Sequence, residues 1–216
     1  MNHYMIKILI ADDHPVVRRG LKQILADFPD MAVEGEAGDG YEVLDKVTQG
    51  DYDLVLLDVS MPKINGIDIL NIWAREGRQR PKVLVLSIYP EEQYAIRALK
   101  AGALGYVTKN TAPTELVTAI RKVAFGDKYV SPSLAEKLAG YLNVDTGKQL
   151  HDMLSNRELQ VLTMIARGKT AKEISSELVL SIKTVATYRA RLLEKLQLKN
   201  NAQIMQYAMQ NQLLEQ

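Results

Sequence analysis

The chain has 216 residues and a formal net charge of +1, and its 47% hydrophobic and 25% charged residues are typical of an ordinary globular protein. That length allows one large domain or two modest ones. The absence of cysteine excludes disulfides, thiolate nucleophiles and Cys-ligated zinc, and the three histidines lie too far apart for metal-ligand spacing. No apolar run approaches the ~18 residues of a membrane span, and the N-terminus enters a strand pattern instead of a signal peptide. We therefore expect a cytoplasmic protein without membrane contact.

The first part of the chain alternates short runs rich in Val, Ile and Leu with segments of helical spacing. The predicted strands are Ile6–Ala11, Met31–Ala37, Leu54–Leu57, Val83–Ser87 and Leu104–Val107. Apolar stripes of helical period follow each of them, and the last two stripes end at Gly102 and Gly126. Five strands that alternate with five helices predict an α/β fold, a doubly wound parallel sheet of flavodoxin type.

Acidic residues stand at the carboxyl ends of two predicted strands. Asp12 and Asp13 follow Ile6–Ala11, and Asp58 follows Leu54–Leu57. Because open parallel sheets place their chemistry at the carboxyl ends of strands, we expect these carboxylates to meet at one edge. Close carboxylates raise one another's pKa unless a cation lies among them, and oxygen ligands of this kind suit Mg²⁺. A carboxylate beside Mg²⁺ can also accept a phosphoryl group.

The alternation weakens after the fifth predicted helix, where glycine, proline and aspartate interrupt it. We interpret residues 127–149 as a linker with one short helix candidate at Ser133–Leu142, between a first domain at 1–126 and a second at 150–216. The first domain carries 15 basic and 17 acidic residues, whereas residues 151–216 carry nine and six. This asymmetry is too mild to establish nucleic-acid binding by itself.

Every signal in the second domain is helical. Ser155 to Glu158 and Thr170 to Glu173 are capping boxes, in which a hydroxyl and a glutamate satisfy backbone N–H groups at a helix start. Ser181 can cap a third helix, and Asn201 a fourth. A short helix, the three-residue turn Val179–Ser181 and a longer helix predict a helix-turn-helix in a small all-α domain of four helices.

Residues at the predicted strand ends resemble the site of response-regulator receiver domains. The matching positions are Asp12, Asp13, Asp58, Ser87 after the fourth strand and Lys109 after the fifth. The run from Asp58 through Ser60 and Pro62 to Gly66 is similar to the phosphorylation loop of that family, and Tyr106 stands where its members carry a switch aromatic. The resemblance spans residues 5–125.

This resemblance implies a phosphorylation mechanism. Asp58 would accept a phosphoryl group from a sensor histidine kinase or from a small donor such as acetyl phosphate. Lys109 would pair with Asp58 before transfer and with the phosphoryl oxygens afterwards. The Ser87 hydroxyl would then bond the phosphoryl group, and Tyr106 would swing inward behind it. The Mg²⁺ ligands would be Asp13, Asp58, the Ser60 backbone carbonyl and, chiefly through water, Asp12.

Single residues of this set also have simpler explanations. Asp13 alone would more often cap the helix that begins at His14-Pro15, and Lys109 alone would more often be a solvated loop residue. Their joint occurrence at matching strand ends favours the site. The chain also departs from the commonest receiver pattern. Many receivers have proline at the position of Asn110, and a small residue at that of Ile88, whose bulk could restrict access to Asp58.

Residues 150–214 resemble the LuxR-type helix-turn-helix domain, so the whole chain resembles the NarL/FixJ subfamily of response regulators. Segments 154–162, 168–174 and 181–185 carry this second resemblance. It implies a DNA-binding domain controlled by the receiver.

A helical wheel sorts the predicted third helix of this domain. Its apolar face, which should pack on the earlier helices, consists of Ile182, Val185, Leu192 and Leu196. On the other face Thr187 and Ala190 could touch thymine methyls, and Lys183 could reach guanine. The expected phosphate contacts are Thr184, Arg191 and Lys195. The alternative is a charged face that only meets solvent, and whether Tyr188 packs or touches the DNA backbone is open.

A last apolar surface lies on Ala202–Met209. Relatives dimerise through this helix, whereas simple packing on the bundle explains it equally well. Because two-fold dimers match two-fold DNA sites, we expect a homodimer on operator DNA after activation. RNA polymerase is a further candidate partner.

We interpret the chain as a phosphorylation-activated transcription regulator, with no enzymatic activity beyond its own phosphorylation and dephosphorylation. A phosphatase of haloacid-dehalogenase type is the rival, but it needs a second aspartate two residues after the nucleophile, where Ser60 stands. In another alternative the receiver is a dimerisation module that works without phosphorylation.

Overall fold

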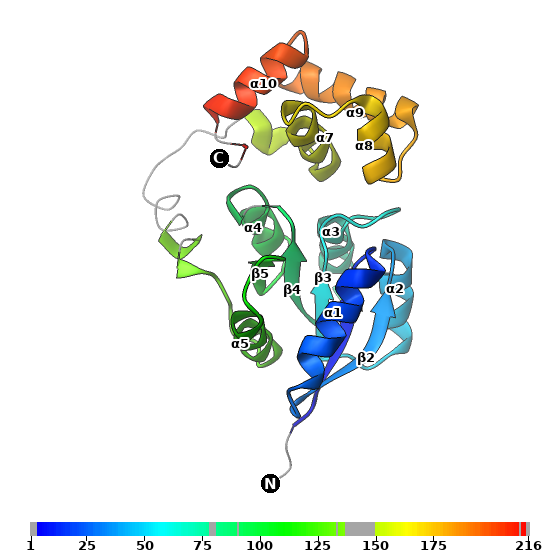
Figure 1. The fold of residues 1–216 in the computed structure, drawn as a ribbon, viewed down its shortest axis with the longest axis vertical. Helices are drawn as coiled ribbons and strands as arrows, with labels where there is room; N and C mark the ends of the chain where they lie inside the picture. Colours follow the sequence, from blue (N-terminus) through cyan, green and yellow to red (C-terminus); the bar gives the residue numbers. More distant parts are fainter. Residues whose placement is uncertain are drawn as a thin grey trace. The chain divides into compact units, whose positions relative to one another are not determined.

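The computed structural model describes residues 4–77, 81–89, 91–132, 134–136, 150–211 and 213–214, with the backbone alone at residues 92 and 93. The chain divides into two compact units, residues 1–140 and 141–216, and each unit is described by itself (Figure 1). Within the described ranges, no helix combines the length and apolar character that crossing a membrane would require.

A parallel sheet of five strands forms the centre of the first unit, in the order β2-β1-β3-β4-β5. The strands are β1 (Ile6–Ala11), β2 (Met31–Ala37), β3 (Leu54–Leu57), β4 (Lys82–Ser87) and β5 (Gly105–Thr108). This order is the flavodoxin-type doubly wound one, so the predicted fold class is confirmed. The first three strands have the predicted bounds, the fourth begins one residue earlier than predicted, and the fifth begins and ends one residue later.

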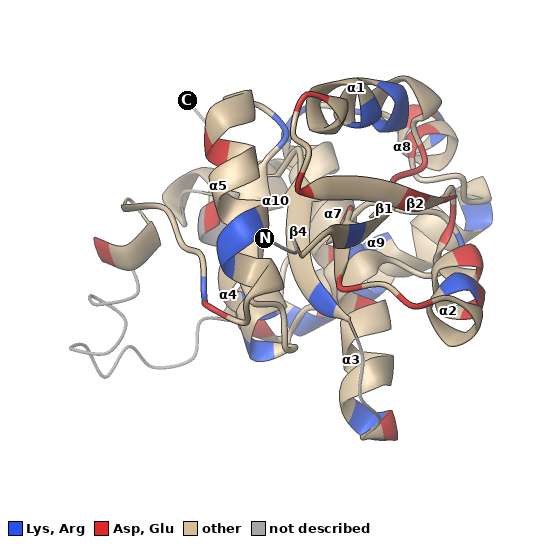
Figure 2. Cartoon of the chain, turned by 90° about the horizontal axis from the view of Figure 1, so that it is seen from below, with Lys and Arg blue, Asp and Glu red and all other residues tan. Residues whose placement is uncertain are grey.

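Helices cover both faces of this sheet (Figure 1). They are α1 (Pro15–Ala26), α2 (Gly40–Gln49), α3 (Gly66–Glu76), α4 (Glu91–Lys100) and α5 (Pro113–Ala124). Apolar residues of α1 and α5 form one buried cluster with alternate residues of β1, β3 and β4, because successive side chains of a strand point to opposite faces. The basic residues of α1 appear as blue bands in Figure 2.

After α5 the chain continues along the edge of the sheet. The Tyr129 backbone N–H donates to the Leu104 carbonyl at 2.8 Å, and Tyr129 forms an isolated parallel bridge with Gly105. Tyr129 and Leu134 are both buried. The predicted linker, residues 127–149, therefore begins with a stretch that packs on the first unit. Residues 137–149, with most of the predicted helix Ser133–Leu142, lie outside the described part of the chain.

The second unit is helical, as predicted. It contains the 3-10 turn η1 (Leu150–Met153) and the helices α7 (Asn156–Ala166), α8 (Ala171–Glu177), α9 (Ile182–Lys195) and α10 (Asn201–Gln210). Both predicted capping boxes are present, and the Ser181 side chain accepts a hydrogen bond from the Thr184 N–H. The cap of α10 is Asn200 and not the predicted Asn201. Asn200 has the extended backbone of a cap and its side chain accepts from the Gln203 N–H, whereas Asn201 is already helical.

Candidate functional site

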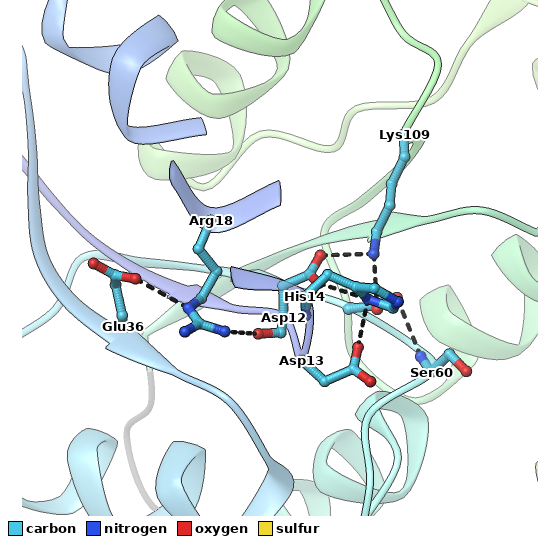
Figure 3. A network of polar contacts seen from close by, with 8 residues as sticks. Asp12, Asp13, His14, Arg18, Glu36, Ser60 and Lys109 are labelled. Carbon is cyan, nitrogen blue, oxygen red and sulfur yellow. Dashed lines mark hydrogen bonds and ion pairs between the residues drawn. The ribbon is translucent and has the colours of Figure 1, made fainter. Parts of the chain in front are cut away.

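The carboxyl ends of β1, β3 and β5 bring Asp12, Asp58 and Lys109 together. Figure 3 shows the Lys109 side chain pointing toward Asp12, with Asp13 and Ser60 nearby. Asp12 and Asp58 are each only 1% exposed. The sheet continues into the site, because the Asp58 N–H donates to the Ala11 carbonyl at 2.8 Å and the Lys109 N–H donates to the Ser87 carbonyl at 2.8 Å. The backbone therefore fixes where these side chains begin.

The Lys109 ammonium lies between the two buried carboxylates. Its Nζ is 2.6 Å from Asp12 Oδ2 and 2.9 Å from Asp58 Oδ2. Burial by itself would lower the pKa of Lys109, but the carboxylates of Asp58 and Asp12 raise it above its ordinary value. Lys109 is therefore charged, and it is no solvated loop residue.

The surroundings of Asp58 disfavour its ionised form. Burial raises its pKa to about 6, Lys109 opposes that rise, and the Asp12 charge adds to it. The Ser60 backbone N–H donates to Asp58 Oδ1 at 3.1 Å, which orients the carboxylate. A further positive charge beside Asp58, such as a bound cation, would therefore favour the ionised carboxylate.

Two basic residues that the sequence reasoning missed lie next to these carboxylates. The Nδ1 of His14 is 2.8 Å from Asp13 Oδ1 and 3.3 Å from Asp12 Oδ1. Arg18 donates to the Asp12 backbone carbonyl at 2.7 Å and to Glu36 at 3.0 Å. His14 was not expected because it lacks metal-ligand spacing to other histidines, although its position directly after two aspartates was a signal.

The simpler explanation for Asp13 does not hold in this structure. The N-cap position of α1 is His14, and no side chain makes a capping hydrogen bond there. The carboxylates of Asp12, Asp13 and Asp58 and the imidazole of His14 each offer a ligand atom, and these atoms all lie within 4.8 Å of one another. Such an oxygen-rich group fits Mg²⁺, which takes one or two carboxylates and keeps several waters.

The loop after Asp58 is shaped by Gly66, the first residue of α3. The Gly66 N–H donates to the Val59 carbonyl at 3.0 Å, and a Cβ at this glycine would lie 2.2 Å from the Asp58 carbonyl oxygen. Only glycine permits this approach of α3 to the strand end. The close approach at Gly66 thus fixes the loop between Asp58 and α3, which contains Ser60.

Ser87, Tyr89 and Tyr106 form a second hydrogen-bonded group, at the carboxyl ends of β4 and β5. The Tyr89 N–H donates to Ser87 Oγ at 3.2 Å, and the Tyr106 hydroxyl donates to the Tyr89 carbonyl at 2.8 Å. Burial raises the pKa of the Tyr106 phenol, so this group stays protonated and donates. Tyr106 is fully buried, so it already holds the inward position that the receiver resemblance implies for the phosphorylated state. Ile88, in contrast, is exposed.

The second unit presents most of the predicted DNA-contacting residues on one side of α9. Lys183, Thr187, Ala190 and Arg191 are exposed and Thr184 is half-buried, whereas Val185, Leu192 and Leu196 are buried. Ile182 is the exception on the predicted packing face, with 55% of its surface exposed. Because it is the first residue of α9, the helices that bury the later apolar residues do not cover it.

Lys195 differs from the other predicted contacts. Its ammonium is 2.6 Å from Glu158 Oε2 and 3.3 Å from the Met153 carbonyl, so it is bound within its own unit. Glu158 is the buried glutamate of the α7 capping box, and Lys195 compensates its charge. This contact competes with the predicted phosphate contact of Lys195.

The apolar surface of α10 is divided between packing and exposure. Ile204 and Ala208 are buried, whereas Met205 is partly exposed and Met209 is 65% exposed. Ile204 and Ala208 thus fit packing on the helical bundle, whereas Met205 and Met209 are exposed and fit the dimer contact. Tyr188 of α9 is half-buried.

Two family models match the chain. "Response regulator receiver domain" matches residues 8–121, and "Bacterial regulatory proteins, luxR family" matches residues 152–208. The first match contains the whole acidic site, and the second contains α7, α8 and α9.

Full-length relatives and solved structures agree with both matches. The chain is 37% identical over 216 residues to the oxygen regulatory protein NreC of Staphylococcus carnosus (strain TM300), with 97% of this chain and all of the relative covered. It is 35% identical to the response regulator UvrY of Escherichia coli (strain K12), with 97% and 96% covered. RcsB from Salmonella enterica serovar Typhimurium, solved bound to promoter rprA in the presence of phosphomimetic BeF3-, has a TM-score of 0.61 and 27% identity over 94% of this chain and 98% of that one. The chain therefore belongs to the response regulators that join a receiver domain to a luxR-family DNA-binding domain, the NarL/FixJ subfamily of two-component systems.

Proposed function

We propose that Asp58 is the phospho-acceptor of this response regulator and that its phosphorylation controls DNA binding by α9. The observation that carries the proposal is the Lys109 ammonium within 2.9 Å of both Asp12 and Asp58, at the carboxyl edge of the sheet. A buried carboxylate that is paired with Lys109 and oriented by the Ser60 N–H suits an acceptor. The direct test is transfer of phosphate from acetyl phosphate, located on Asp58 by mass spectrometry of the borohydride-trapped product.

In the proposed reaction, an oxygen of the Asp58 carboxylate attacks the phosphorus of the donor. A new O–P bond forms, and the P–N bond of a kinase phosphohistidine or the P–O bond of acetyl phosphate breaks, with its electron pair going to the leaving group. Lys109 supplies a fixed positive charge for the phosphoryl oxygens. The Ser87 Oγ accepts from the Tyr89 N–H and is also hydrogen-bonded to the Tyr106 side chain, so its hydroxyl would have to reorient in order to donate to the phosphoryl group.

Mg²⁺ is the proposed cofactor, with ligands from Asp13, Asp58 and the Ser60 carbonyl, and with Asp12 chiefly through water. When bound, it neutralises charge on the carboxylates and on the transferred group. The His14 Nδ1 lies beside this ligand set, 3.3 Å from Asp12 Oδ1 and 2.8 Å from Asp13 Oδ1.

Binding of Mg²⁺ should stabilise the receiver. Burial raises the pKa of Asp58, so keeping this group ionised lowers the free energy of unfolding. A bound cation favours the ionised form and offsets that loss. At a hundred times its Kd, Mg²⁺ is expected to add about 2.7 kcal/mol to the free energy of unfolding. Thermal unfolding with Mg²⁺ against EDTA checks this. Asp13→Asn should lose most of the gain, while Asp27→Asn, at the exposed end of α1, should keep it. An equal gain in both variants would contradict the ligand assignment.

The proposed partners follow from the two domains. They are operator DNA, a sensor histidine kinase or small phosphodonor, and a second copy of the chain after activation, with RNA polymerase a further candidate. We propose that the protein works in the cytoplasm and catalyses no more than its own phosphorylation and dephosphorylation. Ser60 in place of a second aspartate supports a slow switch, because a general acid for rapid phosphatase turnover is missing there.

The proposed DNA interface consists of Lys183, Thr187 and Ala190 at base edges and Thr184, Arg191 and Lys195 at phosphates.

Arg191 and Lys195, the two basic residues proposed to contact phosphates, are expected to respond differently to substitution. Arg191→Ala should weaken binding to all DNA sequences about equally and lower the slope of log affinity against log salt by about one. Lys195→Gln should chiefly destabilise the second unit, because it leaves the buried Glu158 without its cation. Affinity measured over a salt series, with urea unfolding, checks both. A lower salt slope for Lys195→Gln at unchanged stability would restore Lys195 as a phosphate contact.

A further inference from the structure

The segment that follows α5 is bound to the receiver at several points. Its Tyr129 N–H donates to the Leu104 carbonyl beside β5, and the Tyr129 hydroxyl donates to Glu115 of α5 at 2.7 Å. Tyr129 is 8% exposed, and Leu134 is fully buried. The Ser131 hydroxyl donates to the carboxylate of Glu91, the first residue of α4. Tyr129, Ser131 and Leu134, which follow α5, therefore pack as part of the receiver.

Ser131 makes three hydrogen bonds, two of which share its Oγ. Its Oγ donates to Glu91 and accepts from the Leu134 N–H at 3.1 Å, while its carbonyl accepts from the Ala135 N–H at 2.9 Å. Ser131 therefore caps the backbone N–H groups of Leu134 and Ala135. Because the Ser131 hydroxyl donates its hydrogen bond to Glu91, a lone pair of its Oγ points toward the Leu134 N–H. Loss of Glu91 would leave this hydroxyl free to rotate and would weaken the cap.

Glu91 lies four residues after Ser87, at the end of the short connection between β4 and α4. The backbone of Tyr89 lies between them, with its N–H on Ser87 Oγ and its carbonyl on the Tyr106 hydroxyl. The Tyr89 ring stacks on Tyr94 of α4 at 4.6 Å between centroids. Tyr89 therefore contacts both Ser87 and α4.

We propose that the contact between Glu91 and Ser131 transmits the phosphorylation state of Asp58 to the connection with the DNA-binding domain. This inference rests on the proposed function of Asp58. When the Ser87 hydroxyl moves to a phosphoryl group on Asp58, Tyr89 and Glu91 follow, and Glu91 withdraws from Ser131. The cap on Leu134 then weakens. Tyr129 stays in place, held by Leu104 and Glu115. Glu91 and Ser131 are thus positioning residues, because neither touches the reacting atoms.

Amide hydrogen exchange of the full chain tests this, with Mg²⁺ and beryllofluoride as the phosphoryl mimic. In the native sequence, beryllofluoride should change exchange at Tyr89 and speed exchange at Leu134 about fivefold, as expected for loss of one capping bond of ~1 kcal/mol. The Tyr129 amide should not respond. In Glu91→Ala and Ser131→Ala, Leu134 should exchange fast with or without the mimic. Thr118→Ala is the matched control, because it removes an exposed hydroxyl that bonds only within α5, to Thr114.

A second readout is the DNA response, with a duplex selected from a random library by the beryllofluoride-treated chain. Ser131→Ala and Glu91→Ala should accept phosphate from acetyl phosphate as the native chain does. In both variants the ratio of DNA affinities with and without the mimic should fall toward one, and Thr118→Ala should keep the native ratio. Two different variants guard against a folding defect in either one.

The outcomes distinguish this inference from the proposed function. An unchanged Leu134 amide together with a responding Tyr89 amide would overturn the transmission role and leave Asp58 as acceptor. A full DNA response in Glu91→Ala would do the same. If neither amide responded and no phosphate were trapped, the assignment of Asp58 would fail, and the inference with it.

Discussion

Asp58→Asn is expected to abolish covalent phosphorylation by acetyl phosphate. The amide has nearly the shape of the carboxylate but no anionic oxygen that could attack phosphorus. Because the phosphoryl group has one proposed acceptor, trapped label should fall to background and not by a modest factor. The variant should also lose the effect of acetyl phosphate on DNA affinity while it keeps the affinity of the unphosphorylated chain.

The matched control is Asp53→Asn. Asp53 lies directly before β3, at the opposite end from Asp58, and its carboxylate accepts from the Lys7 N–H at 2.9 Å. This variant changes one aspartate of the same strand and should be labelled like the native chain. Label that persisted in Asp58→Asn and disappeared in Asp53→Asn would place the acceptor elsewhere.

Lys109→Gln is expected to be the most destabilising single change at the site. It removes the ammonium that lies 2.6 Å from Asp12 and 2.9 Å from Asp58, and it leaves two buried carboxylates beside each other. Breaking a buried pair in this way costs about 3 kcal/mol of the free energy of unfolding. Urea unfolding of the receiver transition in EDTA measures the loss.

Two further variants test whether Lys109, Asp12 and Asp58 act as one electrostatic unit. Lys7→Gln breaks the exposed ion pair with Asp51, and exposed pairs contribute little, so stability should hardly change. Adding Asp58→Asn to Lys109→Gln removes one of the uncompensated charges and should recover much of the loss. If Lys109→Gln were no more destabilising than Lys7→Gln, the three groups would not form one electrostatic unit.

Much of the receiver could be predicted from the sequence because its signals are local. The apolar runs of β1 and β3 and the aspartates after them needed only the rule that parallel strands share a functional edge. The pairing of Lys109 with Asp12 as well as Asp58 was not predicted. It depends on the register of β5 against β4 and on side-chain direction, neither of which a single sequence specifies.

The failures are at the ends of elements and between them. Ile182 follows the apolar period of α9 but is exposed, because a helical wheel does not say where the neighbouring helices stop. Asn200 and Asn201 are the same residue type, and only the backbone shows which one is the cap. Tyr129 stands among residues that read as a linker, and its burial depends on a long-range bond to Leu104.

The central claim is that phosphate on Asp58 controls DNA binding, and one measurement tests it most directly. It is the affinity of the full chain for a duplex selected from a random library, determined with and without beryllofluoride in Mg²⁺, with mass from light scattering in the same samples. We expect higher affinity and a dimeric mass with beryllofluoride for the native chain, and neither change for Asp58→Asn. Equal affinity and mass in both conditions for the native chain would contradict the account.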